Sequence, residues 1–259
     1  MKTLKVIKIG GNIINNEVSL LSFLKGFSRL NGPKILVHGG GKLASDLSNK
    51  MNIPVQLIDG RRVTNAETLD IITMVYAGKI NKNIVAKLQS FGCNSVGFTG
   101  ADGNTIIANK RSETPINYGF AGDIVKVDIS ILKILINNNI TNIFSAISHD
   151  EKGQLLNTNA DTIASELAIA FSNDYKVELY YCFEKKGVLQ HTNDENSVIK
   201  KINNQTYIEL KKSNIINEGM IPKLDNCFYA LDHNVSKVCI GQPNMLFDHH
   251  SNFTTIQKL

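Results

Sequence analysis

Two lysines lie where a positive charge needs a specific reason. Lys8 interrupts an apolar run directly before Gly10 and Gly11, and Lys223 falls in the first turn of an expected helix beside Pro222. The helix dipole disfavours a cation at a helix N-terminus, so a bound anion nearby would explain Lys223. A lysine at the carboxyl end of a strand can reach a phosphate held by the glycines that follow it. We interpret both lysines as phosphate-binding residues; the alternative for Lys8 is a side chain that points into solvent.

Consecutive glycines end two short apolar runs within the first 41 residues. The first run ends in Gly10-Gly11 and the second in Gly39-Gly40-Gly41. Because glycine has no Cβ, the N–H groups of such turns let an anion come close, and a helix that follows adds its dipole. Neither turn matches the P-loop or the Rossmann pattern. The turns predict a protein that binds two anionic groups side by side; the alternative for the second is a tight turn without a ligand.

Three further positions could bind the second anion. Arg61 and Arg62 precede an expected helix, where a guanidinium can hold a carboxylate through two hydrogen bonds, and one of the two is expected to be only solvated. Asn157 lies just outside another helix and is free to contact a ligand. Asn159 is the expected cap of that helix, which places Asp161 in its first turn, where a carboxylate is favoured with or without a function.

Composition excludes several classes of protein. The 28 basic and 23 acidic residues are dispersed, so no stripe for nucleic acid forms. The four cysteines have no C-x-x-C spacing and the six histidines no metal motif, which favours buried reduced thiols and no metal site. The N-terminus lacks the apolar core of a signal peptide, and no apolar run approaches the roughly 18 residues of a membrane span. We expect a cytoplasmic protein with neither nucleic-acid nor membrane partners.

Strands and amphipathic helices alternate along the chain and would position these residues. The alternation predicts an α/β fold with a mainly parallel sheet, helices on both faces, and ligands at the carboxyl ends of the strands. Thr64 and Glu67 form a capping box that opens a long helix ending near residue 90, and Asp128 can cap another helix. The other expected strands are residues 4–9, 34–38, 140–147, 176–182 and 235–240, with several short strands within residues 94–127. The other expected helices are one that carries residues 20–27 and is capped at Asn15 or Asn16, and residues 42–51, 160–171, 205–212 and 219–231.

Five segments in this order and spacing resemble the amino-acid kinase family, within it the branch that phosphorylates acylglutamates. The segments are K-I-G-G at residues 8–11, V-H-G-G-G at 37–41, G-R-R-V-T at 60–64, L-N-T-N-A-D at 156–161 and G-M-I-P-K at 219–223. The resemblance implies an open αβα sandwich forming one domain over residues 1–259. An N-terminal lobe, about residues 1–172, would bind the acyl amino acid and dimerise, and a C-terminal lobe, about 173–259, would bind nucleotide.

The resemblance also implies a reaction: ATP, with Mg²⁺ held mainly by its phosphates, phosphorylates the side-chain carboxylate of an N-acylglutamate in arginine biosynthesis. Lys8 and Lys223 would bind the nucleotide and stabilise charge on the transferring phosphoryl group, while Asp161 orients both lysines. Gly10 and Gly11 would lie along the ATP phosphates.

By the same resemblance, Arg62 and Asn157 would hold the α-carboxylate of the substrate, and the N–H groups of Gly40 and Gly41 would face its reacting end. A carboxylate is already nucleophilic at neutral pH, so the reaction needs alignment and charge stabilisation but no general base.

Several alternatives stay open. Residues 181–188 read Y-C-F-E-K-K-G-V and lack the S/T-D-V-x-G element of many relatives, so nucleotide contacts are not carried over there, and the acyl group could be succinyl or acetyl. The reaction could be that of a glutamate 5-kinase, carbamate kinase or aspartokinase, or the chain could be a catalytically silent nucleotide-binding subunit. Because Lys8 lies so near Met1, we expect a homodimer without the N-terminal helix of arginine-inhibited hexamers.

Overall fold

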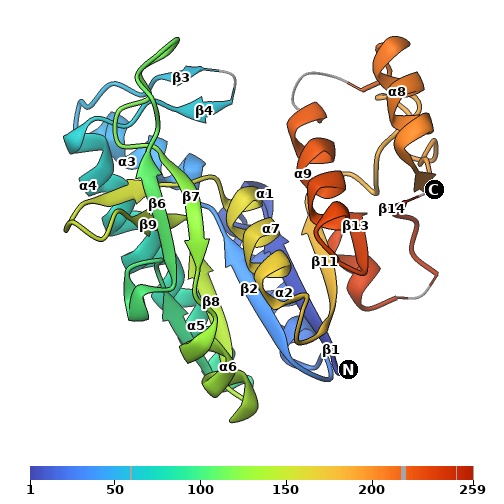
Figure 1. Ribbon diagram of the computed structural model, residues 1–259, viewed down its shortest axis with the longest axis horizontal. Coiled ribbons are helices and arrows are strands. Elements are labelled where there is room, and N and C mark those ends of the chain that lie inside the picture. Colours follow the sequence, from blue (N-terminus) through green and yellow to red (C-terminus); the bar gives the residue numbers. More distant parts are fainter. Residues whose placement is uncertain (59, 217–219, 249, 259) are drawn as a thin grey trace.

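An eight-stranded sheet forms the centre of the computed structural model, which describes residues 1–58, 60–216, 220–248 and 250–258. The strand order is β12-β14-β13-β11-β1-β2-β8-β5 (Figure 1). All neighbouring pairs in this sheet are parallel except β13 with β14. The bounds are β1 Thr3–Ile9, β2 Lys34–His38, β5 Ser95–Phe98, β8 Thr141–Ser145, β11 Lys176–Cys182, β12 Lys201–Ile202, β13 Lys237–Gly241 and β14 Thr254–Ile256.

Helices cover both faces of this sheet, as the complete burial of β2 requires. Helices α7 and α9 pack against each other over one face (Figure 1), and α2 packs on α5. The helix bounds are α1 Gly11–Asn15, α2 Glu17–Ser28, α3 Gly41–Lys50, α4 Ala66–Ile72, α5 Asn81–Ser90, α6 Ser130–Asn137, α7 Ala160–Phe171, α8 Asn204–Lys212 and α9 Ile221–Asp232. A π-helix, η1 Thr73–Ile80, joins α4 to α5, and the 3₁₀ turns are η2 Asp102–Asn104 and η3 Pro243–Leu246.

Smaller sheets extend the molecule beyond the carboxyl ends of the central strands. A four-stranded sheet has the order β10-β9-β6-β7, and β3 pairs with β4 as a separate hairpin (Figure 1). Their bounds are β3 Leu57–Ile58, β4 Arg61–Arg62, β6 Ile106–Lys110, β7 Gly122–Val127, β9 Ile147–His149 and β10 Leu155–Asn157. These pieces hold Arg62 and Asn157 above the central sheet.

Most of the predicted elements are confirmed, but two predicted helix caps are wrong. Asn65, not Thr64, caps α4: its Oδ1 accepts a hydrogen bond from the Thr68 N–H at 2.8 Å. Thr64 is fully buried and pairs as an extended residue with Gly119, where a β-branched residue fits well. Helix α6 begins at Ser130 with Ile129 at its cap, and Asp128 instead accepts from the Ser130 N–H at 2.9 Å just outside the helix.

Other predictions differ only in boundaries. The segment expected as one strand over residues 140–147 is divided between β8 and β9, and the helix expected from Gly219 begins at Ile221, Gly219 itself lying outside the described residues. All four cysteines are free and buried, as predicted. Within the described ranges no helix is both long and apolar enough to cross a membrane.

Candidate active site

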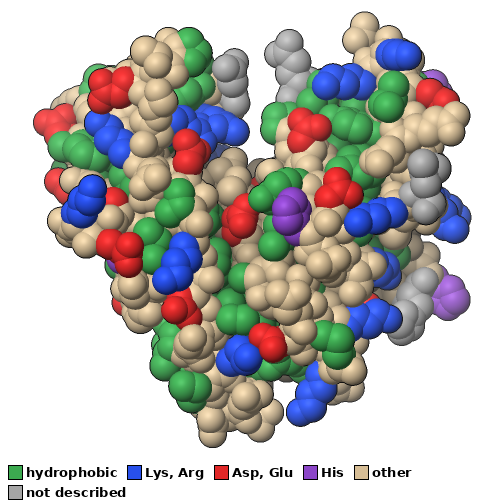
Figure 2. All heavy atoms as spheres, viewed as in Figure 1, with side chains coloured by type: hydrophobic (Ala, Val, Ile, Leu, Met, Phe, Trp, Pro, Cys, Tyr) green, Lys and Arg blue, Asp and Glu red, His purple; other side chains and the backbone are tan. Residues whose placement is uncertain are grey.

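The two glycine turns lie side by side at the carboxyl edge of the central sheet. Strands β1 and β2 are adjacent and parallel, with Ile9 paired to His38, so the turns that follow them meet. They open a cavity of about 270 Å³, which the starts of α1, α3 and α7 help to line. Figure 2 shows the surface hollowed here, between the part that carries β3 and β4 and the part that carries α8 and α9. Apart from Lys223, every site residue predicted from the sequence lines this cavity.

One carboxylate joins the two predicted phosphate-binding lysines. The Lys8 Nζ lies 2.8 Å from Asp161 Oδ1, and the Lys223 Nζ lies 2.6 Å from Asp161 Oδ2. The three side chains are only 14–17% exposed. Lys8 comes from β1, Asp161 from the first turn of α7 and Lys223 from the first turn of α9, so three distant parts of the chain meet at this carboxylate. Lys223 is not itself a lining residue of the cavity, but it contacts Asp161, which is.

Electrostatic interactions keep the Asp161 carboxyl group ionised. Burial by itself raises the pKa of the Asp161 carboxyl, but the nearby Lys8 and Lys223 ammonium groups outweigh it and hold the pKa well below its usual range. Burial lowers the pKa of Lys8, and Lys223 lowers it further against the attraction of Asp161. Two cations and one anion therefore leave an excess of positive charge beside the glycine turns.

Tyr181 contacts both Asp161 and Lys223 of the cluster. The sequence did not indicate this role. Its hydroxyl donates to the backbone oxygen of Asp161 at 3.1 Å, and its ring centroid lies 5.2 Å from the Lys223 Nζ. The side chain is almost completely buried on β11. In the sequence Tyr181 reads only as one more apolar residue of a buried strand.

The two glycine turns differ in what they present to the cavity. The Gly10 N–H donates to the backbone oxygen of Cys182 at 3.2 Å, so it closes the sheet. Gly11 is the first residue of α1, where an N–H has no partner within the helix, and is the better placed donor. At Gly40, a Cβ would overlap the end of the Ile80 side chain and press on the Tyr76 ring, so the absence of a Cβ allows the close approach of η1.

Arg62 lies against the second turn and is largely buried there. Its Nη2 donates to the backbone oxygen of Gly41 at 2.9 Å and to Ser45 Oγ at 2.8 Å, and the residue is 9% exposed. Its Nη1 is buried and has no hydrogen-bond partner among the residues that the structure describes. A buried guanidinium nitrogen without a partner is well suited to an anion in the cavity it lines. Arg61 is exposed, as expected for one of the two arginines.

The opposite wall presents an amide and a second arginine. The Asn157 Nδ2 donates to Thr64 Oγ1 at 3.0 Å, and the residue lines the cavity from β10. Arg111 lines the same cavity and forms an ion pair with Asp123. Tyr76 on η1 completes the wall; its pKa is raised by burial against the opposing effect of Arg62, so its hydroxyl stays protonated. Tyr76 and Ser45 were not predicted, because helical spacing alone makes them ordinary core and surface residues.

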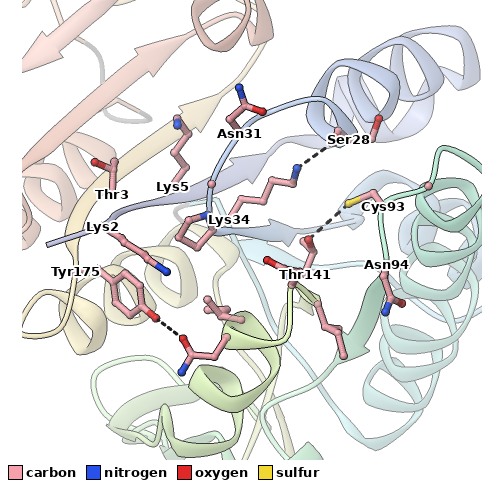
Figure 3. A pocket seen from close by; sticks show the side chains of 17 residues that line it. Lys2, Thr3, Lys5, Ser28, Asn31, Lys34, Cys93, Asn94, Thr141 and Tyr175 are labelled. Atoms are coloured by element: carbon pink, nitrogen blue, oxygen red, sulfur yellow. Dashed lines mark hydrogen bonds between the residues drawn. The ribbon is translucent and has the colours of Figure 1, made fainter.

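A larger cavity, about 640 Å³, lies at the opposite edge of the sheet and includes none of these residues. Figure 3 shows its side chains, among them Lys2, Lys5 and Lys34. The Lys34 Nζ donates to the backbone oxygens of Ser28 and Leu30 at 3.1 and 2.8 Å, near the end of α2. Lys34 is therefore engaged with a helix C-terminus.

Comparison with known proteins identifies the family of the chain. The model of the amino acid kinase family matches residues 3–242, most of the chain. The chain belongs to the amino acid kinase family. It is 53% identical to a protein named acetylglutamate kinase from Cytophaga hutchinsonii, covering 96% of this chain and 94% of that one. It is 46% identical to a protein of the same name from Bacteroides thetaiotaomicron, covering 98% of each.

A solved structure shares the fold at lower identity. The crystal structure of smu.665 from Streptococcus mutans UA159 matches with a TM-score of 0.79 at 24% identity, covering 98% of each chain. The amino acid kinase fold, with its largely parallel sheet and flanking helices, is thus the fold predicted from the sequence.

Proposed function

We propose that the protein transfers the γ-phosphoryl group of ATP to the side-chain carboxylate of N-acetyl-L-glutamate, forming an acyl phosphate in arginine biosynthesis. The observation that carries the proposal is the Lys8–Asp161–Lys223 cluster beside a cavity whose other wall holds the Arg62 Nη1, which has no partner within the described part of the chain. One end of the site suits phosphates, the other a carboxylate. The relatives named acetylglutamate kinase support this choice of substrate.

The chemistry follows from the residue types. A carboxylate oxygen of the acceptor attacks the γ-phosphorus, the bond from that phosphorus to the β,γ-bridging oxygen breaks, and ADP leaves with the electron pair. No proton moves, because the acceptor is ionised at neutral pH. Lys8 and Lys223 stabilise charge on the transferring group while Asp161 keeps both ammonium groups in place.

The two turns serve opposite ends of this reaction. Gly10 and Gly11 lie along the ATP phosphates, with the Gly11 N–H as donor. The N–H groups of Gly40 and Gly41 face the reacting carboxylate, and Arg62 with Asn157 holds the α-carboxylate of the acceptor. This division places two mutually repelling anions in line, which accounts for a large part of catalysis in phosphoryl transfer.

Magnesium fits the site as an ion bound to the nucleotide. Among the described residues no three His, Cys, Asp or Glu side chains gather as a metal site, and both Asp161 oxygens already face lysines. Mg²⁺ would therefore be held mainly by ATP phosphates and would neutralise their charge, as this ion commonly does.

N-succinyl-L-glutamate is the second candidate acceptor. A succinyl group carries an additional carboxylate, and Arg111 on the cavity wall is a cation of matching type. Arg111 is already paired with Asp123, however, so a second carboxylate would compete with a protein carboxylate. The uncharged acetyl group meets no such competition, which favours N-acetylglutamate.

We also propose a homodimer that works in the cytoplasm. The edge strand β5 ends the large sheet and leaves Val96 38% exposed, which suits contact between two N-terminal lobes of residues 1–172. Four free, buried thiols suit a reducing compartment. The C-terminal lobe, residues 173–259, contributes Lys223 and binds nucleotide. Sedimentation equilibrium tests the dimer: a mass near twice 28.6 kDa supports it, and a monomer contradicts it.

A coupled assay of ADP release tests the function. The purified protein is given ATP and Mg²⁺ with N-acetylglutamate, N-succinylglutamate, glutamate, aspartate or carbamate, one at a time. We expect the highest kcat/KM with N-acetylglutamate and none with carbamate, which has no α-carboxylate for Arg62 and Asn157. A preference for N-succinylglutamate would move the assignment to that acceptor. Turnover with none would identify a silent nucleotide-binding subunit.

A further inference from the structure

His38 is a fully buried polar residue beside the second glycine turn with no part in the function proposed above. It is the last residue of β2 and directly precedes Gly39. Its Nδ1 lies 2.9 Å from the Gly39 oxygen, and its Nε2 lies 3.1 Å from Asn81 Nδ2. The same Asn81 nitrogen lies 2.9 Å from the backbone oxygen of Ile143 on β8. A continuous line of hydrogen bonds thus runs from β8 to the glycine turn.

The direction of each hydrogen bond in this line is determined by its ends. The Ile143 oxygen can only accept, so the Asn81 amide must turn its NH₂ group toward it and toward His38. The His38 Nε2 is then the acceptor and carries no proton. The Gly39 oxygen can also only accept, so His38 Nδ1 carries the proton and donates. One tautomer of a neutral imidazole satisfies both ends.

Burial favours the neutral ring that this arrangement needs. Desolvation lowers the pKa of His38 to about 4, against the opposing effect of its hydrogen bond to Gly39. A protonated ring would turn an N–H donor toward the Asn81 NH₂ group. That group is itself a donor and has no lone pair to accept a hydrogen bond.

The held carbonyl determines where the next N–H points. In a trans peptide, the C=O of Gly39 and the N–H of Gly40 point in opposite directions. Because the Gly39 oxygen turns back toward the buried imidazole, the Gly40 N–H is directed away from the imidazole, and Gly40 itself lines the cavity. Ile80, the neighbour of Asn81, packs where a Cβ of Gly40 would lie, so the junction of η1 and α5 holds the turn at two points.

We propose that His38 is a positioning residue for phosphoryl transfer: it orients the Gly40 N–H toward the acceptor carboxylate through the Gly39 carbonyl, and Asn81 holds the His38 ring in the tautomer that this requires. The inference rests on the proposed function, since it assigns Gly40 to the reacting end of the acceptor. Neither side chain touches substrate. The relay acts by keeping a backbone donor aligned, and a donor aimed at developing charge matters more in the transition state than in the bound substrate.

A matched pair of substitutions at one position separates the relay from simple packing. Asparagine can place an N–H donor where Nδ1–H lies, so His38→Asn keeps the bond to Gly39 and loses the contact to Asn81. Glutamine reaches the Nε2 position, so His38→Gln keeps an acceptor for Asn81 and loses the donor to Gly39. We expect H38Q to lower kcat about 10- to 100-fold, with the KM for ATP within twofold of wild type, and H38N to stay within about threefold.

Nitrogen-15 NMR of the wild type reports the tautomer without any assay. We expect a protonated Nδ1 and an unprotonated Nε2 for His38 at pH 7. A protonated Nε2, equal kcat losses in the two variants, or H38Q within twofold of wild type would each overturn the relay. If H38Q does not fold, the wild-type tautomer decides. If the wild type turns over no acceptor, the proposed function fails, and the tautomer alone decides whether the relay exists.

Discussion

Two largely buried lysines at opposite edges of the same sheet show how the same side chain comes to contact different kinds of partner. Lys8, at the carboxyl end of β1, contacts the Asp161 carboxylate, whereas Lys34, at the amino end of β2, donates to two carbonyl oxygens near the end of α2. Burial is the main cause of a lowered pKa for both. Their partners differ: Lys8 contacts a carboxylate that it shares with another lysine, whereas Lys34 contacts carbonyl groups that belong to a helix end.

The difference follows from the polarity of an α/β sheet. Helices end at the amino edge of the strands, where the carbonyl groups of the last helical turn attract a cation and bind it. Helices begin at the carboxyl edge, where unpaired N–H groups and the helix dipole favour an anion. A lysine there gains nothing from the dipole and is held by Asp161 instead. Lys8, Lys223 and Arg62 exceed this single carboxylate in charge, so the carboxyl edge carries an excess of positive charge, which suits phosphate and carboxylate groups.

Removing the shared carboxylate should have the largest effect. Asp161→Asn leaves Lys8 and Lys223 close together without an anion, so we expect kcat to fall about 10³-fold and the free energy of unfolding to fall by about 3 kcal/mol. ADP release and urea denaturation measure the two effects. A kcat within tenfold of wild type would show that the lysines hold their positions without Asp161.

Removing either lysine of the cluster should reduce the rate and spare the fold. For Lys8→Ala and Lys223→Ala we expect kcat to fall 10²- to 10³-fold, about 3–4 kcal/mol of transition-state stabilisation. Asp161 keeps one lysine partner in each variant, and for Lys8 the cost of a buried ammonium is removed as well. Circular dichroism checks the fold. A kcat within threefold of wild type would refute the assigned role.

Arg62→Lys tests the acceptor side of the same edge. Arg62 bonds Gly41 and Ser45 through Nη2 and has Nη1 left for a ligand carboxylate, whereas lysine has a single nitrogen for all three, so we expect the KM for the acylglutamate to rise about 10- to 100-fold. The KM for ATP should stay within twofold. Equal increases in both constants would contradict the division of the cavity into donor and acceptor halves.

His38 makes stability at this edge depend on pH. Its pKa is about 4 in the folded protein and about 6.5 in the unfolded chain, so the unfolded chain takes up the proton first as the pH falls. His38 thus costs the fold up to about 3 kcal/mol as the pH drops from 6.5 to 4. Urea denaturation of the wild type and of His38→Asn at pH 7 and pH 4.5 measures it. An equal loss of stability in both proteins would show that His38 is not the group responsible.

Lys34→Met, at the amino edge, should have the smallest effect. Two carbonyl groups lose a donor, so the free energy of unfolding should fall by about 1–2 kcal/mol. We expect kcat and both KM values within twofold of wild type, because Lys34 lies far from the cavity along the strand direction. A kcat loss comparable to that of Lys8→Ala would remove the distinction between the two edges.

The sequence predicted the two lysines, the glycine turns and Arg62 because each lies in a short segment whose local pattern is unusual. It also predicted the α/β fold, since buried parallel strands and amphipathic helices differ clearly in periodicity. Tyr181, Tyr76 and Asn81 escaped because their partners are more than 10 residues away and become neighbours only in the fold. The prediction that Thr64 caps a helix was wrong for a related reason: Thr64 makes a tertiary contact with Asn157 instead of the local capping contact.

Trapping the product tests the central claim most directly. An acyl phosphate reacts with hydroxylamine to give a hydroxamate, which a colour reaction with iron(III) quantifies beside ADP. With ATP, Mg²⁺ and N-acetylglutamate, we predict equal amounts of ADP and hydroxamate from the wild type and at least 100-fold less of both from Lys8→Ala. ADP released without hydroxamate would contradict transfer to a carboxylate, and equal yields from the variant would contradict the role of the lysine cluster.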